Sequence, residues 1–170
     1  KPEKPGQPII KEIGSRNVTA WWSASGNDMN SAIISYKLYI KHCTDTKQVK
    51  SWEVGPDIFE KTALDLSPYT CYKAFVVAEN AVGPSDPSLE SDEFFTLEEA
   101  PSEVPYNLHS ANQTSTEIFM AWEAPPSGTL NGVLTGYLIK YGLNKNNLTS
   151  VNITDPLATV RHLQTCLPSR

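Results

Sequence analysis

Short runs of the chain alternate between hydrophobic and polar positions. Every second residue is apolar or aromatic in the runs 18–22, 36–40 and 72–78, and clusters of Gly, Pro, Asn and Ser separate such runs. A period of two is typical of β-strands with one buried face, and no segment sustains the period of an amphipathic helix. Roughly seven such runs in ~100 residues indicate a β-sandwich. The pattern therefore predicts an all-β fold of two packed antiparallel sheets.

The same pattern occurs twice in the chain. The run 18–22 (VTAWW) matches 118–122 (IFMAW), and the run 34–40 matches 134–140. Each copy begins with a Pro-containing segment, and the second of these, EEAPSEVP, is polar and follows the strand-like run EFFTL, as expected of a linker. We therefore predict a first domain over residues 1–97, a linker over 98–104 and a second domain over 105–170.

The residues of the first copy resemble the fibronectin type III domain. That family has a core Trp on strand B, a Tyr on strand C and the pattern Leu-x-Pro-x-Thr-x-Tyr-x-x-x-Val-x-Ala-x-Asn-x-x-Gly-x-x-Ser from the E–F corner to the F–G loop. This chain has Trp22, Tyr36 and the run LSPYTCYKAFVVAENAVGPS over 66–85. The resemblance covers Pro8 to Leu97. It implies an immunoglobulin-like β-sandwich in which Tyr72 forms a tyrosine corner.

The second copy follows the family only from Pro105 through Tyr137. After Leu163 the chain reads QTCLPSR and lacks the Pro-x-Thr-x-Tyr pattern, so we expect its strands F and G to be absent. Either the natural chain continues, or this is a truncated or alternatively spliced product. In the second case the missing strands would leave an open strand edge. We then predict that the second half packs poorly or pairs with another chain.

Three cysteines are present, and the resemblance implies a partner for two of them. In this fold strands C and F are antiparallel neighbours, so Cys43 at the end of C lies beside Cys71 at the start of F. A register that pairs them also pairs Tyr39 with Phe75. We predict a Cys43–Cys71 disulfide, and the alternative is two free thiols in a cytosolic domain. Cys166 pairs with nothing in this fragment or reflects an abnormal terminus.

Four Asn-x-Ser/Thr sequons indicate a glycosylated protein. They occur at Asn17, Asn112, Asn147 and Asn152, and none contains Pro. Asn17 alternates with a core position and is expected to face solvent. The alternative is that one or two of these sequons are chance matches, and the last two lie close together.

The sequons and the expected disulfide together favour an oxidising, extracellular compartment or the cell surface.

Composition narrows the possible functions. The 170 residues are 39% hydrophobic and 19% charged with a formal net charge of −5, which is typical of globular proteins and disfavours nucleic acid as a partner. No apolar run reaches the length of a membrane span, and the start KPEKP is not a signal peptide. We therefore expect an internal fragment that meets a membrane only through a parent chain.

Catalysis and metal binding need convergent side chains, and the sequence offers no such set. His42, His109 and His162 stand without Cys or carboxylate at ligand spacing, and no Gly-x-Ser-x-Gly, His-Glu-x-x-His or phosphate-binding Gly loop is present. We predict no enzyme activity, metal, cofactor or small-molecule substrate. The expected F–G loop, 81–87, contains Asp86 but no Arg, so integrin binding through Arg-Gly-Asp is not supported.

Candidate binding residues therefore lie on the surface. Tyr39, Phe75 and Val77 are expected to form an apolar stripe on the outer face of strands C and F, flanked by lysines, while Trp21 is expected on the outer face of the other sheet. The alternative is that these are ordinary sheet residues covered by lysine stems, neighbouring strands or glycan.

The resemblance implies a non-catalytic extracellular protein-binding or spacer module of a cell-surface adhesion or receptor protein, similar to neural adhesion molecules and receptor tyrosine phosphatase ectodomains. One alternative is a cytokine-receptor-type ligand-binding pair. Another is an accessory spacer domain of a larger enzyme, such as a receptor tyrosine phosphatase. An intracellular muscle-type array is disfavoured by the sequons and the expected disulfide. The expected partner is a protein ligand or a neighbouring cell-surface protein.

Overall fold

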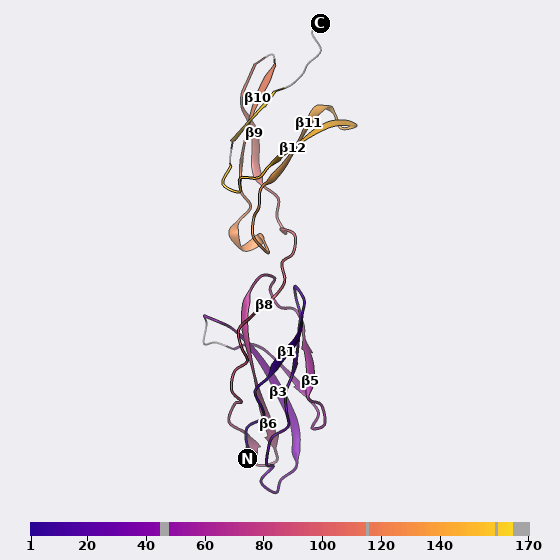
Figure 1. The fold of residues 1–170 in the computed structure, drawn as a ribbon, viewed down its shortest axis with the longest axis vertical. Helices are drawn as coiled ribbons and strands as arrows, with labels where there is room; N and C mark the ends of the chain where they lie inside the picture. The colour runs from indigo at the N-terminus through magenta and orange to yellow at the C-terminus, as the bar shows by residue number, and fades with distance from the viewer. Residues whose placement is uncertain (45–47, 115, 159, 165–170) are drawn as a thin grey trace. The chain divides into compact units, whose positions relative to one another are not determined.

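The chain forms two compact units, Lys1–Glu99 and Ala100–Arg170. The structure is a computed structural model, and it describes residues 1–44, 48–114, 116–158 and 160–164 (Figure 1). Each unit is described by itself below. The domain limits and the linker expected over 98–104 stay predictions.

Two antiparallel sheets form unit 1. One sheet has the order β1-β2-β5, and in the other β6 pairs β3, β7 and β8, while β3 also pairs β4. The strands of unit 1 are β1 (Ile9–Ile13), β2 (Val18–Trp21), β3 (Ile33–His42), β4 (Gln48–Val54), β5 (Glu60–Ala63), β6 (Cys71–Asn80), β7 (Gly83–Pro84) and β8 (Phe94–Phe95).

The register between β3 and β6 agrees with the sequence pattern. Tyr39 lies opposite Phe75, as expected, and Leu38 lies opposite Val76. Along β6, buried and half-buried residues alternate over all ten positions. Because successive side chains of a strand point to opposite faces, this register sends Leu38 and Val76 to the core and Tyr39 and Phe75 outward.

The core of unit 1 lies between the two sheets. Trp22 and Tyr36, the aromatic residues expected there, are 0% and 2% exposed, with ring centroids 6.3 Å apart. Full burial of one such large side chain stabilises by about 1.5–3 kcal/mol. The other buried members are Val18, Ala20, Leu38, Ile40, Ala63, Leu66, Tyr72, Ala74, Val76, Ala78 and Phe94.

A tyrosine corner closes this core where the chain enters β6. The Tyr72 ring is 1% exposed, and its hydroxyl accepts a hydrogen bond from the Ser67 N–H at 3.0 Å. The turn at the other end of β6 is held by Asn80, whose Oδ1 accepts hydrogen bonds from the N–H groups of Val82 and Gly83. Gly83 has φ +138°, a conformation that favours glycine.

On the edge of β6 that does not pair with β3, three serines take the place of a regular strand between β7 and β8. Ser85, Ser88 and Ser91 are buried, and their N–H groups donate to the carbonyls of Ala78, Val76 and Ala74. Each serine Oγ in turn accepts the N–H of the same β6 residue at 2.9–3.0 Å. The segment 85–91 thus advances three residues for every two of β6, and it provides hydrogen-bond partners for the backbone N–H and C=O groups along that edge.

Unit 2 has the same type of strand order in its described part. One sheet has the order β13-β10-β9, and β11 pairs β12. The small core consists of Trp122, Ile139 and Ile153, whereas every residue of β9 is exposed. The elements are β9 (Tyr106–Gln113), β10 (Glu117–Glu123), the 3-10 turn η1 (Ser127–Thr129), β11 (Tyr137–Asn144), β12 (Asn147–Ile153) and β13 (Val160–Gln164).

Strands build both units, so the all-β prediction is confirmed. The expected absence of strands F and G from the second copy stays a prediction, because residues 165–170 lie outside the described part of the chain. Cys166 belongs to that stretch. Within the described residues, the structure contains no helix of sufficient length and apolarity to span a bilayer.

Candidate functional site

The outward face of β3 and β6 carries the expected aromatic pair. The rings of Tyr39 and Phe75 stack with centroids 4.9 Å apart and an angle of 14° between their planes. Val77, two residues further along β6, is half-buried like both rings. We call Tyr39, Phe75 and Val77 the aromatic face. Because stacking fixes both rings before any partner arrives, this face is preorganised for contact.

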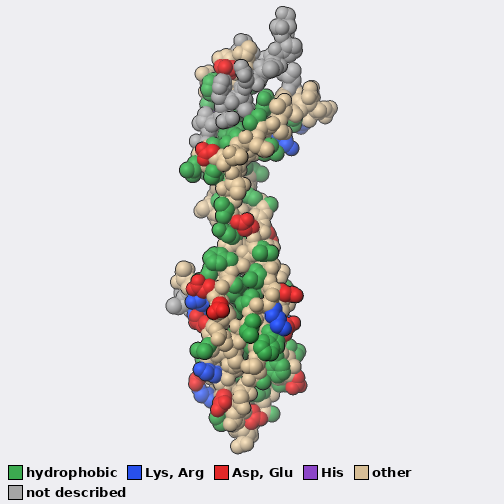
Figure 2. Space-filling view, in the orientation of Figure 1, with side chains coloured by type: hydrophobic (Ala, Val, Ile, Leu, Met, Phe, Trp, Pro, Cys, Tyr) green, Lys and Arg blue, Asp and Glu red, His purple; other side chains and the backbone are tan. Residues whose placement is uncertain are grey.

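Lysine–glutamate pairs border the aromatic face. Lys37 lies 3.7 Å from Glu53, and Lys73 lies 3.2 Å from Glu93. Lys41, the third lysine that the sequence places there, forms an ion pair with Glu90, which also lies 4.0 Å from Lys73. On the face of unit 1 that Figure 2 shows, positive and negative side chains are interspersed. The aromatic face is thus an apolar strip within a polar, nearly neutral border.

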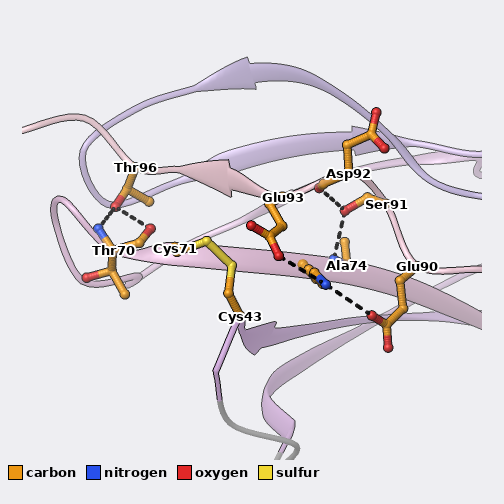
Figure 3. Close-up of a disulfide and its surroundings, with 10 residues drawn as sticks. Cys43, Thr70, Cys71, Ala74, Glu90, Ser91, Asp92, Glu93 and Thr96 are labelled. Atoms are coloured by element: carbon orange, nitrogen blue, oxygen red, sulfur yellow. Dashed lines mark hydrogen bonds and ion pairs between the residues drawn. A yellow bond between two sulfur atoms is a disulfide. The ribbon is translucent and has the colours of Figure 1, made fainter.

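The predicted disulfide joins Cys43 to Cys71 at the end of β3 (Figure 3). Their Cα atoms are 5.5 Å apart, and the Cys43 N–H donates to the Cys71 carbonyl at 3.1 Å. The Glu93 carboxylate lies within 4.8 Å of both sulfur atoms. A metal binds cysteine as the thiolate, and here the two sulfurs are bonded to each other, so Cys43 and Cys71 form a structural crosslink.

Trp21, the other candidate binding residue, lies on the outward face of β2. It is 36% exposed, and Lys11 Nζ lies 5.7 Å from the ring centroid. Lys11 also forms a 2.8 Å ion pair with Glu60, which lies opposite Trp21 on β5. The Lys11 ammonium group therefore lies over the ring in a cation–π arrangement.

The four sequon asparagines are all exposed. Asn17 precedes β2 and shares the outward side of that strand with Trp21, so a glycan there would lie on the sheet opposite the aromatic face. In unit 2, Asn112 lies on β9, and Asn147 and Asn152 lie on β12. Their glycosylation stays a prediction.

The described histidine side chains have local structural contacts. His42 packs on the Tyr72 ring with centroids 4.8 Å apart, and His109 Nδ1 lies 2.6 Å from the Asn107 carbonyl. The backbone of His162 lies in β13, and its side chain is outside the described part.

Sequence reasoning missed two features of unit 1. The first is the set of serines along β6, of which Ser91 is drawn in Figure 3, although the spacing S-x-x-S-x-x-S was a visible signal. The second is the ion pair between Arg16 and Glu99, 2.8 Å from Nη2 to Oε2. The hydrogen bonds from the Arg16 guanidinium hold the pKa of Glu99 below its ordinary value of 4.5.

Known proteins resemble most of this chain. DSCAM, a cell adhesion molecule of Homo sapiens, is 31% identical over 144 residues, which is 83% of this chain and 7% of DSCAM. Protein sidekick-2 of Mus musculus is 30% identical over 144 residues, again 83% of this chain and 7% of the relative. A protein of Aedes aegypti described as a receptor-type tyrosine-protein phosphatase, mosPTP-1, is 30% identical over 146 residues, 82% of this chain and 11% of the relative. The chain thus spans only a small part of these relatives.

Solved structures agree on the fold. The chicken CNTN1 FN1–FN3 domains match with a TM-score of 0.69 at 22% identity, over 96% of this chain and 56% of that one. At this identity the match concerns the fold alone, and it confirms the predicted immunoglobulin-like sandwich. The family model for the fibronectin type III domain matches residues 3–94, which is more than half of the sequence. The chain therefore belongs to the fibronectin type III family.

Proposed function

We propose that this chain is a non-catalytic, extracellular module that binds a protein partner and spaces neighbouring domains in a cell-surface adhesion or receptor protein. Two of the relatives above are an adhesion molecule and a receptor phosphatase by name, which supports this class of parent protein. The fibronectin type III domain is itself a non-catalytic module. Any enzyme activity of a parent chain would reside elsewhere in it.

The aromatic face is the observation that carries the binding role. Tyr39 and Phe75 are stacked and half-buried, so ordering them costs little side-chain entropy when a partner binds. Their ion-paired border supplies the polar rim that surrounds the apolar centre of many protein interfaces. A glycan at Asn17 would lie on the other sheet and leave this face open.

The extracellular location rests on two further observations. The Cys43–Cys71 disulfide is typical of oxidising compartments, and all four sequon asparagines are accessible. Expression in a secretory host should give a protein whose gel mobility increases after peptide N-glycosidase treatment. A secreted product with no glycan at any sequon would contradict this part of the proposal.

A second parent class is favoured by the similarity to mosPTP-1. In that case the chain is an accessory spacer of a receptor tyrosine phosphatase. A cytokine-receptor-type pair stays a third possibility with no observation in its favour. The full-length transcript distinguishes these classes, because it would encode a phosphatase domain, further repeats or neither.

Binding to living cells tests the partner-binding role. The purified, fluorescently labelled chain is applied at graded concentrations, and bound fluorescence is measured with and without prior trypsin treatment of the cells. We expect saturable, trypsin-sensitive binding that Tyr39→Ala and Phe75→Ala weaken, whereas Trp21→Ala on the other sheet leaves it unchanged. Circular dichroism and thermal melting establish that each variant is folded.

The outcomes separate the two surfaces and the two roles. Loss of binding in Trp21→Ala alone would move the site to the outward face of β2. Equal binding by all variants would contradict the aromatic face as the site. No saturable binding by the wild-type chain to any cell type tested would leave the spacer role and remove the binding role.

A further inference from the structure

One Asn-Gly pair occurs in the chain, at Asn131-Gly132, in the loop between η1 and β11. The Asn131 side chain binds the first residue of unit 2, because its Nδ2 donates to the Ala100 carbonyl at 3.1 Å. Close by, the Ser102 N–H donates to the Thr129 carbonyl at 2.9 Å. This loop therefore anchors residues 100–102.

We propose that Asn131 is a site of spontaneous deamidation that releases this anchor as the protein ages. In the first step the deprotonated backbone nitrogen of Gly132 attacks the Asn131 side-chain carbonyl carbon. A new C–N bond closes a five-membered succinimide, and the amide nitrogen leaves as ammonia. Water then opens the ring at either carbonyl and gives aspartate or isoaspartate. Water is the only co-reactant, and no oxidant is needed.

In the described part of the chain the attacking nitrogen has no hydrogen bond to break, and Gly132 is half-buried. The Gly132 N–H donates no hydrogen bond to any group within the described residues, and Gly132 has no side chain to hinder the approach. Among the described residues the Asn131 amide makes one hydrogen bond, through Nδ2, and the residue is half-buried. Rotation of the side chain toward the Gly132 nitrogen therefore breaks one bond.

Two other asparagines differ from Asn131 in these contacts and are not followed by glycine. Asn80 is 3% exposed, and its side chain is held by hydrogen bonds to the carbonyls of Asp28 and Ser31 and from two backbone N–H groups. Asn30 is exposed, but the N–H of the following Ser31 donates to the Asp28 carbonyl at 3.2 Å. At Asn80 the side-chain amide is held in place, and after Asn30 the backbone nitrogen that would attack is already hydrogen-bonded.

Deamidation would replace the hydrogen bond between the Asn131 side chain and the Ala100 carbonyl by electrostatic repulsion between two oxygen atoms. The amide Nδ2 is a donor to the Ala100 carbonyl, whereas a carboxylate at the same position has only acceptors and a negative charge. Two oxygen atoms would then face each other without a proton between them. Isoaspartate adds a backbone carbon as well. We therefore expect Ala100 to be released from the loop, and the hydrogen bonds from Ser102 to the Thr129 carbonyl, which Asn131 does not make, to open more often.

Incubation of the full chain at mildly alkaline pH tests the chemistry, because base favours the attacking amide anion. Peptide mapping by mass spectrometry, with isoaspartate detection, follows Asn131, Asn80 and Asn30 over several weeks. We expect conversion at Asn131 to exceed that at either of the others several-fold. Gly132→Ala retains Asn131 and its anchor and should slow conversion several-fold. Gly132 is not among the glycines with positive φ, so alanine is compatible with its backbone conformation, and circular dichroism checks that the variant is folded.

Hydrogen exchange tests the consequence. The Ser102 amide should exchange several-fold faster in the aged chain and in Asn131→Asp, and at the original rate in unaged Gly132→Ala. An unmodified Asn131 in a chain that deamidates at Asn80 or Asn30 would overturn the proposal. Conversion without any change in Ser102 exchange would refute the release of the anchor.

Discussion

Ser88 is hydrogen-bonded to Val76 twice, once through its backbone and once through its side chain. The Ser88 N–H donates to the Val76 carbonyl at 2.9 Å, and Ser88 Oγ accepts the Val76 N–H at 2.9 Å. In a regular antiparallel pair two backbones exchange these bonds. Here the serine hydroxyl takes the place of one backbone carbonyl. The segment 85–91, which advances three residues for every two of β6, can therefore still pair the backbone N–H and C=O groups along that edge of β6.

Substitution of Ser88 by Ala should therefore destabilise unit 1 more than an ordinary surface change. Ser88 is 7% exposed and Val76 is 0% exposed, so the Val76 N–H would lose its acceptor in a buried position. Leaving such a donor unsatisfied costs about 1–3 kcal/mol of unfolding free energy. Urea unfolding followed by tryptophan fluorescence measures the change.

Ser51→Ala provides the matched control, because Ser51 is exposed on β4 and makes no side-chain hydrogen bond within the described residues. We expect its unfolding midpoint to stay within error of the wild type. Equal midpoints for Ser88→Ala and Ser51→Ala would mean that water satisfies the Val76 N–H and that the serine hydroxyl is dispensable.

The tyrosine corner gives a second stability prediction. Tyr72→Phe removes the hydroxyl that accepts the Ser67 N–H at 3.0 Å and leaves the buried ring in place. We expect the unfolding free energy to fall by about 1 kcal/mol, the usual net contribution of one hydrogen bond.

Tyr39→Phe is the control for this change, since the Tyr39 hydroxyl makes no hydrogen bond within the described part of the chain. Urea unfolding of both variants, with the slope m compared as well as the midpoint, separates a lost bond from a changed denatured state. A Tyr72→Phe variant as stable as Tyr39→Phe would contradict the structural role of the corner.

Much of unit 1 could be predicted from the sequence because its strands bury one face. The alternation in β6 fixed which of Phe75 and Val76 faces the core, and pairing Cys43 with Cys71 then aligned β3 with β6. The segment 85–91 could not be placed in the same way. Its buried residues are serines at a spacing of three, so hydrophobic periodicity carries no information about it.

The candidate site was predictable only in part, for a related reason. Register placed Tyr39 and Phe75 side by side, and the resulting stack follows from the period of two. Which carboxylates pair with the lysines could not be read from the sequence. Lys41 and Glu90 are 49 residues apart, and their meeting depends on the irregular path of the chain after β7.

The disulfide leads to a third prediction. Cys43 and Cys71 are separated by 28 residues, and the chain-entropy estimate for closing a loop of that length is ~3–4 kcal/mol of stability. The double variant Cys43→Ala/Cys71→Ala should lose about this amount in urea unfolding. Alkylation of the unreduced wild type should leave both cysteines unmodified in the mass spectrum, and their full alkylation would refute the crosslink.

The Arg16–Glu99 pair predicts how stability depends on pH. The Arg16 guanidinium lowers the pKa of the Glu99 carboxyl, so the ionised form is favoured in the folded chain. The stabilisation is then fully present above the ordinary pKa of 4.5 and is lost as the pH falls through the lowered pKa of the folded state.

Glu99→Gln should be less stable than the wild type near neutral pH, and the urea unfolding midpoints of the two proteins should converge in acid. Glu12→Gln, the same change at an exposed position on β1, serves as the control for the loss of one surface carboxylate. Urea midpoints measured from neutral to acidic pH provide the check, and a constant gap between Glu99→Gln and the wild type would show that the loss does not arise from ionised Glu99.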